Sequence, residues 1–173
     1  MRVIGESRSQ AERKVAVHTA DFEAAYERYA DMLYRIALSD LGNPHDAQDA
    51  VQETFVAYFS YKGTFESEEH RKAWLIRVLI NKVRDELRRK KVRSYTPFED
   101  VPEIASAEPE DRGVMEEIQK LPEKYKTPII LHYLEDIPIE RIAAILGITL
   151  SGAKMRLKRG RDMLREMLRD YTV

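Results

Sequence analysis

The sequence contains no cysteine among its 173 residues. Disulfide frameworks, thiolate zinc sites, iron–sulfur clusters and thiol nucleophiles are therefore excluded, and the absence is compatible with a reducing compartment. Long apolar runs are also missing, since no stretch approaches the roughly 18 residues of a membrane span. Residues 1–18 mix charged and small side chains without the apolar core of a signal peptide. We therefore expect a protein that stays in the cytoplasm and is not inserted in a membrane.

Glycine and proline are scarce, and so are patterns that support catalysis. Seven of each, without repeats or low-complexity tracts, indicate a folded globular chain, and 43% hydrophobic residues are enough for one ordinary domain or two small ones. The four histidines lack metal-ligand spacing, and neither a phosphate-binding glycine loop nor a nucleophile motif is present. We therefore expect no catalytic residue, no metal and no cofactor.

The net charge is only -1, yet the charges are strongly segregated along the chain. Residues 19–70 hold eleven acidic and three basic side chains, and residues 94–112 hold six acidic and one basic. In contrast, residues 71–93 hold ten basic and two acidic side chains, and residues 149–169 hold seven and two. Both basic blocks fall on predicted helices. Two such blocks favour nucleic-acid binding over the alternative that they are only solvent-exposed helix faces.

Apolar spacing in the first half of the chain predicts three helices. One helical stripe begins at Phe22. A second helix begins at Asn43-Pro44, because asparagine suits an N-cap and proline suits the first helical position. A third follows Ser67 and ends near Arg93, with the basic residues on its other faces. These three helices are expected to form one bundle.

The second half of the chain is predicted to be a separate helical domain. Residues 94–112 combine three prolines and six acids without periodicity, which is typical of a linker. Shorter helices follow, and then Pro138 begins a helix, Gly147 marks a turn and Leu150 begins a longer basic helix, as in a helix-turn-helix. The predicted fold is all-α, with two small helical domains, residues 19–93 and 113–173, an acidic linker, residues 94–112, and an N-terminal extension expected to be flexible, residues 1–18.

The last predicted helix has two chemically different faces. If Leu157 faces the core, Leu150, Ala153 and Leu164 lie within about 40° of it, at 100° per residue. The opposite side then presents Ser151, Met155, Lys158 and Arg159, with Lys154 and Arg156 on the flanks. Lysine and arginine suit guanine acceptors or phosphates, so this helix is a candidate to enter a major groove.

Three ordered motifs carry a resemblance to a known family. They are the stretch 46–55 (DAQDAVQETF), the stretch 73–81 (AWLIRVLIN) with Asp85 and Leu87-Arg88-Arg89, and the ending from Leu121-Pro-Glu-Lys-Tyr125 through Gly160-Arg161. Together, over about residues 20–170, they resemble a bacterial RNA polymerase sigma factor of the extracytoplasmic-function group. The resemblance implies an initiation subunit that binds core RNA polymerase and promoter DNA. It further implies that the first domain melts the -10 element, that the second reads the -35 element, and that an anti-sigma factor holds the protein inactive.

The resemblance also implies roles for individual residues. Polymerase docking falls on an acidic stripe with three- and four-residue spacing: Asp46, Asp49, Gln52 and Glu53. Recognition and melting of the -10 element fall on the third helix and on the loop 61–67 before it: Phe65, Lys72, Arg77, Asn81, Arg84 and Arg88. Recognition of the -35 element falls on the last helix: Lys154, Met155, Arg156, Lys158 and Arg159.

The chain departs from the family pattern within the last motif. Where the family usually has Gly-Thr-Val-Lys-Ser-Arg, residues 151–156 are Ser-Gly-Ala-Lys-Met-Arg. Hydroxyl groups are therefore missing at Gly152 and Met155, so the promoter sequence of the family does not transfer to this chain.

Several alternatives stay open at the level of sequence. Trp74 suits the core better than the melting site, and Asn81 and Asp85 also suit local caps or ion pairs. A conventional helix-turn-helix regulator would act without polymerase, but the basic third helix has no task in it. A helical interaction protein without nucleic acid would leave both basic blocks unexplained.

Overall fold

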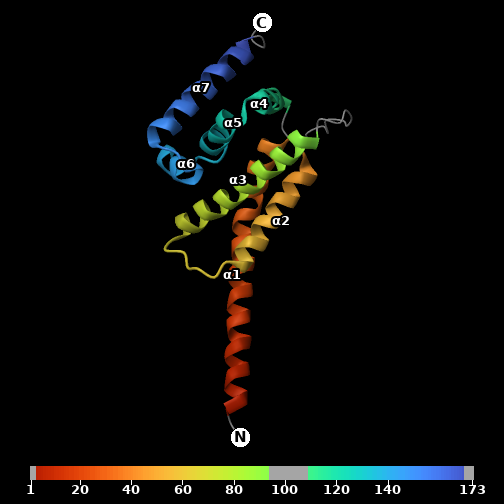
Figure 1. The fold of residues 1–173 in the computed structure, drawn as a ribbon, viewed down its shortest axis with the longest axis vertical. Helices are drawn as coiled ribbons and strands as arrows, with labels where there is room; N and C mark the ends of the chain where they lie inside the picture. Colours follow the sequence, from red (N-terminus) through yellow and green to blue (C-terminus); the bar gives the residue numbers. More distant parts are fainter. Residues whose placement is uncertain (1–2, 94–108, 170–173) are drawn as a thin grey trace.

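The computed structural model describes residues 3–93 and 109–169. Within these ranges every regular element is helical, and the helices form two groups, as Figure 1 shows. The predicted all-α fold is therefore confirmed. Most of the predicted linker lies outside the described residues, and its last four residues begin the first helix of the second group.

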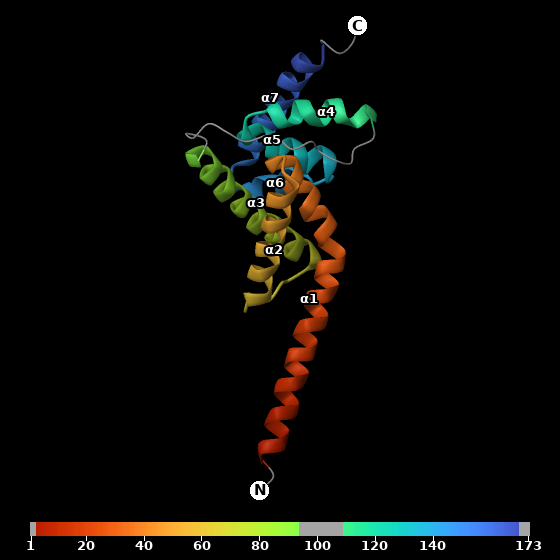
Figure 2. The ribbon, with the colours of Figure 1, turned by 90° about the vertical axis from the view of Figure 1, so that its right-hand side faces the viewer.

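Three helices form the first group, which we call domain 2 after the corresponding domain of the family that the sequence resembles. They are α1 (Val3–Leu41), α2 (Pro44–Ser60) and α3 (Glu68–Arg93). The apolar stripe predicted the start of α1 at Phe22, whereas the structure continues it back to Val3, beyond the other helices (Figure 2). Residues 3–18, which we expected to be a flexible extension, belong to this helix, and seven of these sixteen residues are Glu, Arg, Gln or Ala, which have good helix propensity.

The junction between α1 and α2 has the predicted cap. Gly42 ends α1 with φ of 66°, a left-handed conformation that glycine adopts without steric cost. The side chain of Asn43 accepts a hydrogen bond from the backbone N–H of Asp46 at 3.0 Å, and Pro44 occupies the first helical position. A sharp turn at Gly42, with the first turn of α2 capped by Asn43, therefore joins α1 to α2.

Aliphatic side chains fill the core of domain 2. Its largest fully buried aliphatic side chains come from α1 and α3: Leu33, Ile36, Leu75, Ile76, Leu79, Ile80 and Val83. Phe55 and Tyr58 close the core from α2. The apolar spacing that predicted these helices is thus the face that each helix buries.

Four helices and one π-helical turn form the second group, domain 4. They are α4 (Pro109–Lys120), α5 (Glu123–Ile129), the π-helical turn η1 (Ile130–Leu134), α6 (Ile139–Leu146) and α7 (Leu150–Arg169). Gly147 lies between α6 and α7 with φ of 64°, which gives the tight left-handed turn of a helix-turn-helix. The predicted motif is present, but the widened π turn after α5 was not predicted.

Candidate nucleic-acid interface

The outer face of α7 presents the predicted -35 residues to solvent. Ala153, Leu157 and Gly160 are buried, whereas Ser151, Lys154, Met155, Lys158 and Arg159 are exposed and Arg156 is half-buried. The predicted division into two faces therefore holds, with one error. Leu150, the first residue of α7, is 39% exposed.

Gly160 allows α7 to lie unusually close to α5. A Cβ at this position would lie 2.8 Å from Ile129 Cγ1, closer than a van der Waals contact permits. The same contact brings the guanidinium of Arg159 to Tyr125, whose hydroxyl accepts a hydrogen bond from Nη1 at 3.4 Å. This bond, together with one from Lys124, lowers the pKa of Tyr125. Arg159 is thus held at the exposed edge of the domain.

The first turn of α7 is capped at Gly152, one of the two positions that depart from the family pattern. Thr149 Oγ1 accepts a hydrogen bond from the backbone N–H of Gly152 at 3.0 Å, which caps the helix. A Cβ at Gly152 would approach this Oγ1 at 3.1 Å. A side chain at position 152 would therefore crowd the capping hydroxyl of Thr149.

Four predicted -10 residues share one face of α3, spaced three or four residues apart: Arg77, Asn81, Arg84 and Arg88. Asn81 is exposed, and the guanidinium of Arg88 lies 3.2 Å from Asp85. Arg77 and Arg84 instead contact domain 4. Lys72 lies apart from this row, beside a cavity between the domains.

Phe65 belongs to an aromatic cluster rather than extending freely from the loop. Its ring lies 5.9 Å from Tyr58, 5.0 Å from Tyr61 and 5.7 Å from Trp74, measured between ring centroids. Trp74 is partly buried against the domain core, which supports its structural interpretation. The loop before α3 thus presents a packed aromatic platform, a suitable surface for stacking an unpaired base.

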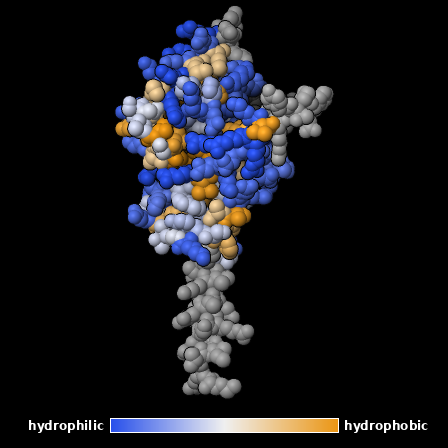
Figure 3. All heavy atoms as spheres, in the orientation of Figure 1, coloured by the Kyte–Doolittle hydropathy of each residue, from blue (hydrophilic) through white to orange (hydrophobic). Residues whose placement is uncertain are grey.

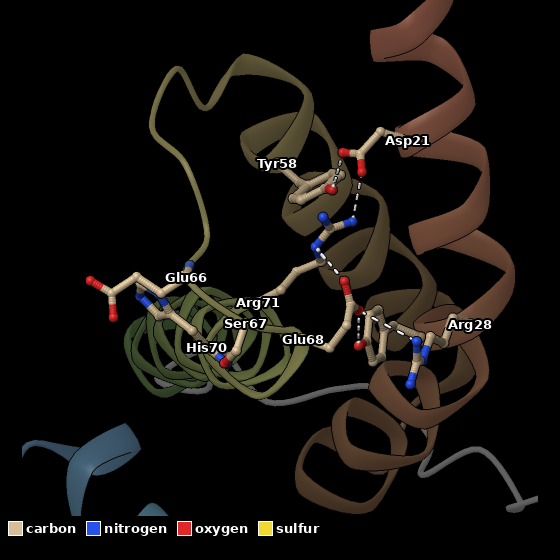
Figure 4. Close-up of polar contacts among 9 residues, drawn as sticks. Asp21, Arg28, Tyr58, Glu66, Ser67, Glu68, His70 and Arg71 are labelled. Carbon is tan, nitrogen blue, oxygen red and sulfur yellow. Dashed lines mark hydrogen bonds and ion pairs between the residues drawn. The ribbon is translucent and has the colours of Figure 1, made fainter.

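A network of polar groups holds this platform and was missed in the sequence (Figure 4). The guanidinium of Arg71 donates to Asp21 at 2.8 Å and lies 5.5 Å from the centre of the Phe65 ring. Asp21 also accepts a hydrogen bond from the hydroxyl of Tyr58 at 2.6 Å, and burial together with this bond raises the pKa of Tyr58. Because Asp21 comes from α1, Tyr58 from α2 and Arg71 from α3, the network joins all three helices.

The network continues to the start of α3. Glu68 forms an ion pair with Arg71 and accepts a hydrogen bond from the hydroxyl of Tyr29 at 2.7 Å; burial raises the pKa of Tyr29 to about 12, with the bond adding to the shift. Ser67 accepts a hydrogen bond from the backbone N–H of His70 at 3.1 Å, so it caps α3. The contacts between helices had no local sequence signal, because Tyr29 and Glu68, Asp21 and Tyr58, and Asp21 and Arg71 are 37 to 50 residues apart.

The predicted docking residues on α2 do not all face solvent equally. Asp49, Gln52 and Glu53 are exposed. Asp46 pairs with Lys90, and Glu53 lies 3.0 Å from Lys82, so both carboxylates are paired with α3. Asp49, which lies 3.3 Å from the ring of exposed His45, is the most accessible acid of the stripe.

Exposed apolar side chains lie beside this acidic stripe, although most of the visible surface is hydrophilic (Figure 3). Val56 is 66% exposed, Phe59 53% and Tyr26 47%. With Phe22, Phe55 and Gln52 they line a shallow groove between α1 and α2. Phe59 continues the apolar spacing of the buried Phe55 and Tyr58, yet it is exposed, because periodicity alone does not show where a helix surface is left uncovered.

None of the helices in the described part of the chain combines the length and the apolar character of a membrane span. Among the same residues, no three histidine or acidic side chains come together as a metal site would require.

Comparison with known proteins matches both domains. The model of Sigma-70 region 2 matches residues 25–93, and that of Sigma-70, region 4, matches residues 112–164. The ECF RNA polymerase sigma factor SigW of Bacillus subtilis is 32% identical over 82% of this chain and 86% of its own. The RNA polymerase sigma factor SigV of the same organism is 33% identical over 78% and 83%.

Solved structures share the fold. The sigma factor RpoE of Bartonella quintana, solved in complex with the anti-sigma factor NepR, has a TM-score of 0.68 at 23% identity, over 86% of this chain and 97% of that chain. CnrH, solved in complex with the cytosolic domain of CnrY, has a TM-score of 0.66 at 24% identity, over 90% and 91%. The sequence matches and the two-domain helical architecture agree. The chain therefore belongs to the ECF RNA polymerase sigma factors, the transcription initiation factors that direct RNA polymerase to promoters.

Proposed function

We propose that the two domains divide promoter recognition, with α7 reading the -35 element in the major groove. The observation that carries this assignment is the row of exposed side chains, Lys154, Met155, Lys158 and Arg159, opposite the buried face of α7. Arginine can donate two hydrogen bonds to guanine O6 and N7, and lysine can neutralise phosphates. Arg156 is half-buried, so its part is limited to the edge of this surface.

Domain 2 is proposed to hold the -10 element. The basic row on α3 would bind phosphates, and the aromatic platform around Phe65 would stack an extruded base. Arg71 is half-buried, and its guanidinium is engaged by Asp21 and by the Phe65 ring, so it supports this platform rather than contacting DNA.

The α2 stripe is proposed to dock on core RNA polymerase, with Asp49 and Gln52 as its accessible centre. An acidic surface suits a basic partner, and complementary charge raises the rate and the specificity of association. Asp46 and Glu53 must first release Lys90 and Lys82 to contribute fully, since both are paired within domain 2.

Three further parts of this assignment follow from the same family membership. The chain performs no catalytic step of its own and works where the polymerase is, in the cytoplasm. An anti-sigma factor is the proposed inhibitor. Chemistry at the growing RNA chain then belongs to the polymerase.

Two substitutions test the division of roles. Asp49→Lys reverses a charge on the docking stripe, so it should weaken polymerase binding and lower transcription from every cognate promoter alike. Arg159→Ala removes a base-reading side chain, so it should cost about 1–3 kcal/mol and relax preference at one -35 position while polymerase binding persists. The measurements are run-off transcription on -35 variants and a polymerase-binding assay.

Matched controls keep the two effects apart. Glu116→Lys makes the same charge change at an exposed position of α4, and Arg165→Ala removes an exposed arginine near the end of α7. Both should stay close to the wild type. The assignment is wrong if Asp49→Lys and Arg159→Ala give the same pattern, or if folded Arg159→Ala loses polymerase binding.

A further inference from the structure

Met155 is an exposed apolar side chain on a strongly basic surface. It is 49% exposed and lies on the outer face of α7 with Lys154, Lys158 and Arg159. Leu150, at the start of α7, is the other large apolar residue of this helix that is exposed. A single exposed apolar side chain is ordinary on a protein surface. The significance of Met155 therefore depends on what surrounds it.

The helical neighbours of Met155 leave it accessible. Long side chains on an α-helix point back over the preceding turn, toward the residues three and four positions earlier. For Met155 these residues are Gly152, which has no side chain, and Ser151, which has a short one. The two departures from the family pattern, Gly152 and Met155, thus lie side by side on one face of α7. One removes a side chain from the surface over which the other extends.

Met155 also lies at a suitable place along α7 to meet a base edge. In a helix-turn-helix, residues in the N-terminal part of the second helix contact base edges. Met155 lies in the second turn of α7, and Arg159 follows one turn later, about 6 Å along the helix axis. Arg159 is held in place by its hydrogen bond to the hydroxyl of Tyr125. Since successive bases of a strand are about 3.4 Å apart, the two side chains would meet base pairs at most about two steps apart.

The chemistry of a thioether favours one of the four bases. The sulfur of methionine donates no hydrogen bond and accepts only weakly, so Met155 cannot satisfy the N7 acceptors of guanine and adenine. Cytosine presents an amino donor, for which the sulfur is a poor partner. Thymine presents a 5-methyl group in the major groove, and the flexible, polarisable methionine side chain adapts well to such an apolar contact.

We propose that Met155 selects thymine at one position of the -35 element through apolar contact with its 5-methyl group. The inference rests on the proposed role of α7 in reading this element. Arg159 and the lysines then supply hydrogen bonds and phosphate contacts, while Met155 adds discrimination that depends on one methyl group. The selected thymine lies within about two base pairs of the position whose preference Arg159 sets.

Selection from promoter duplexes with a randomised -35 element measures these preferences. Holoenzymes are formed from core polymerase with the wild type, Met155→Ser or Arg159→Ala, and the bound DNA is sequenced. The wild type should enrich thymine at one position, and Met155→Ser should lose this enrichment while the other positions stay the same. Arg159→Ala should relax a different, nearby position. Because Met155 is exposed, Met155→Ser should remain folded, which circular dichroism checks.

Deoxyuridine then tests the methyl group alone, since it differs from thymidine only in lacking that group. With deoxyuridine at the selected position, the wild-type holoenzyme should bind the promoter about fourfold more weakly, the effect expected for one apolar carbon. The Met155→Ser holoenzyme should bind both promoters equally. 5-Methylcytosine carries the same methyl group, so the wild type should prefer it to cytosine at this position by a similar factor.

Two control variants show that the effect belongs to the apolar side chain at position 155. Met155→Leu keeps an apolar side chain of similar volume and should retain the discrimination against deoxyuridine. Val114→Ser removes an exposed apolar side chain from α4, away from α7, and should behave like the wild type.

The outcomes separate this inference from the proposed role of α7. Equal binding of the thymidine and deoxyuridine promoters by the wild type would overturn the role of Met155. A deoxyuridine effect that persists in Met155→Ser would overturn it too, and so would selection without an enriched thymine. If neither Met155→Ser nor Arg159→Ala changes the selected sequence, the proposed role of α7 itself is wrong.

Discussion

Asp40 connects pH to the contact between the domains, because its buried carboxylate accepts hydrogen bonds from Thr127 of domain 4 at 3.0 and 3.2 Å. Burial raises its pKa from 3.8 to about 6, and Glu123 acts in the same direction, whereas Lys126, Thr127 and Arg84 oppose the shift. Once the domains separate, the carboxyl group returns to water and its pKa returns toward its ordinary value. The state in which the domains are in contact, the joined state, then binds the proton more tightly, so its stability falls as the pH rises through about 6 and increases on acidification.

We expect the ratio of joined to separated domains to rise about tenfold between pH 7 and pH 5, since the proton is gained mainly by the joined state. Distances between spin labels on Gln48→Cys in α2 and Glu166→Cys in α7, two exposed positions, give the populations at the two pH values. Asp40→Asn removes the titrating group while keeping an acceptor for Thr127, so its ratio should change little over this range. An equal pH response in wild type and Asp40→Asn would assign the effect to other groups.

Gly160 sets the distance between α7 and α5. Gly160→Ala places a methyl group 2.8 Å from Ile129 Cγ1, and such overpacking costs about 1–3 kcal/mol, against a gain of about 1 kcal/mol in helix propensity. Urea unfolding should therefore show a net loss of up to about 2 kcal/mol.

Gly113→Ala is the matched control for this substitution. Gly113 lies within α4 and has no heavy atom within 4 Å of the added methyl group, so this variant should gain up to about 1 kcal/mol. Stabilisation by Gly160→Ala as well would show that the two helices separate at little cost.

Contacts between residues close together in the sequence could be predicted, whereas contacts between distant residues could not. Asn43-Pro44 was recognised because a cap depends on residues three positions apart, and the structure places both as predicted. The partners of Asp40 and Arg35 are 86 to 100 residues away and come from the other domain. No local pattern encodes such pairs, so the contact between the domains could not be predicted.

At the scale of an element, the cap of α2 supports the helix that carries the docking stripe. Asn43→Ala removes the acceptor for the N–H of Asp46, which should cost about 1 kcal/mol in urea unfolding. Asn43→Asp keeps an acceptor and should stay near the wild type. Polymerase affinity should be unchanged at temperatures where both variants are folded. A large loss of affinity in folded Asn43→Ala would mean that the cap itself lies in the docking surface.

Helices were predicted well where one face is apolar, and less well where geometry departs from a regular period. The buried face of α7 followed from 100° spacing, as Ala153 and Leu157 show. The π turn 130–134 gave no such signal, because widening one turn leaves the local composition unchanged. Exposure of Phe59 likewise depends on which neighbours cover a helix, and periodicity does not specify that.

At the scale of the whole molecule, the free chain should bind promoter duplex weakly. Its two DNA-binding surfaces must be oriented together before both can bind, so part of the binding energy is lost. Fluorescence anisotropy at physiological salt should show large tightening when core polymerase is added. Nanomolar, sequence-specific binding by the free chain would instead support a conventional regulator.

The end of α1 also limits how domains can be exchanged between relatives, because Lys126 of domain 4 donates to the carbonyl oxygen of Asp40. A chimera that joined residues 1–93 to the second domain of another factor would bring Asp40 against unrelated side chains. Unless that domain supplied a hydroxyl in place of Thr127 and a cation in place of Lys126, the buried carboxylate would be left without compensation. Such a hybrid should hold its two domains together less firmly, so transplanting promoter specificity would also change the stability of the contact between the domains.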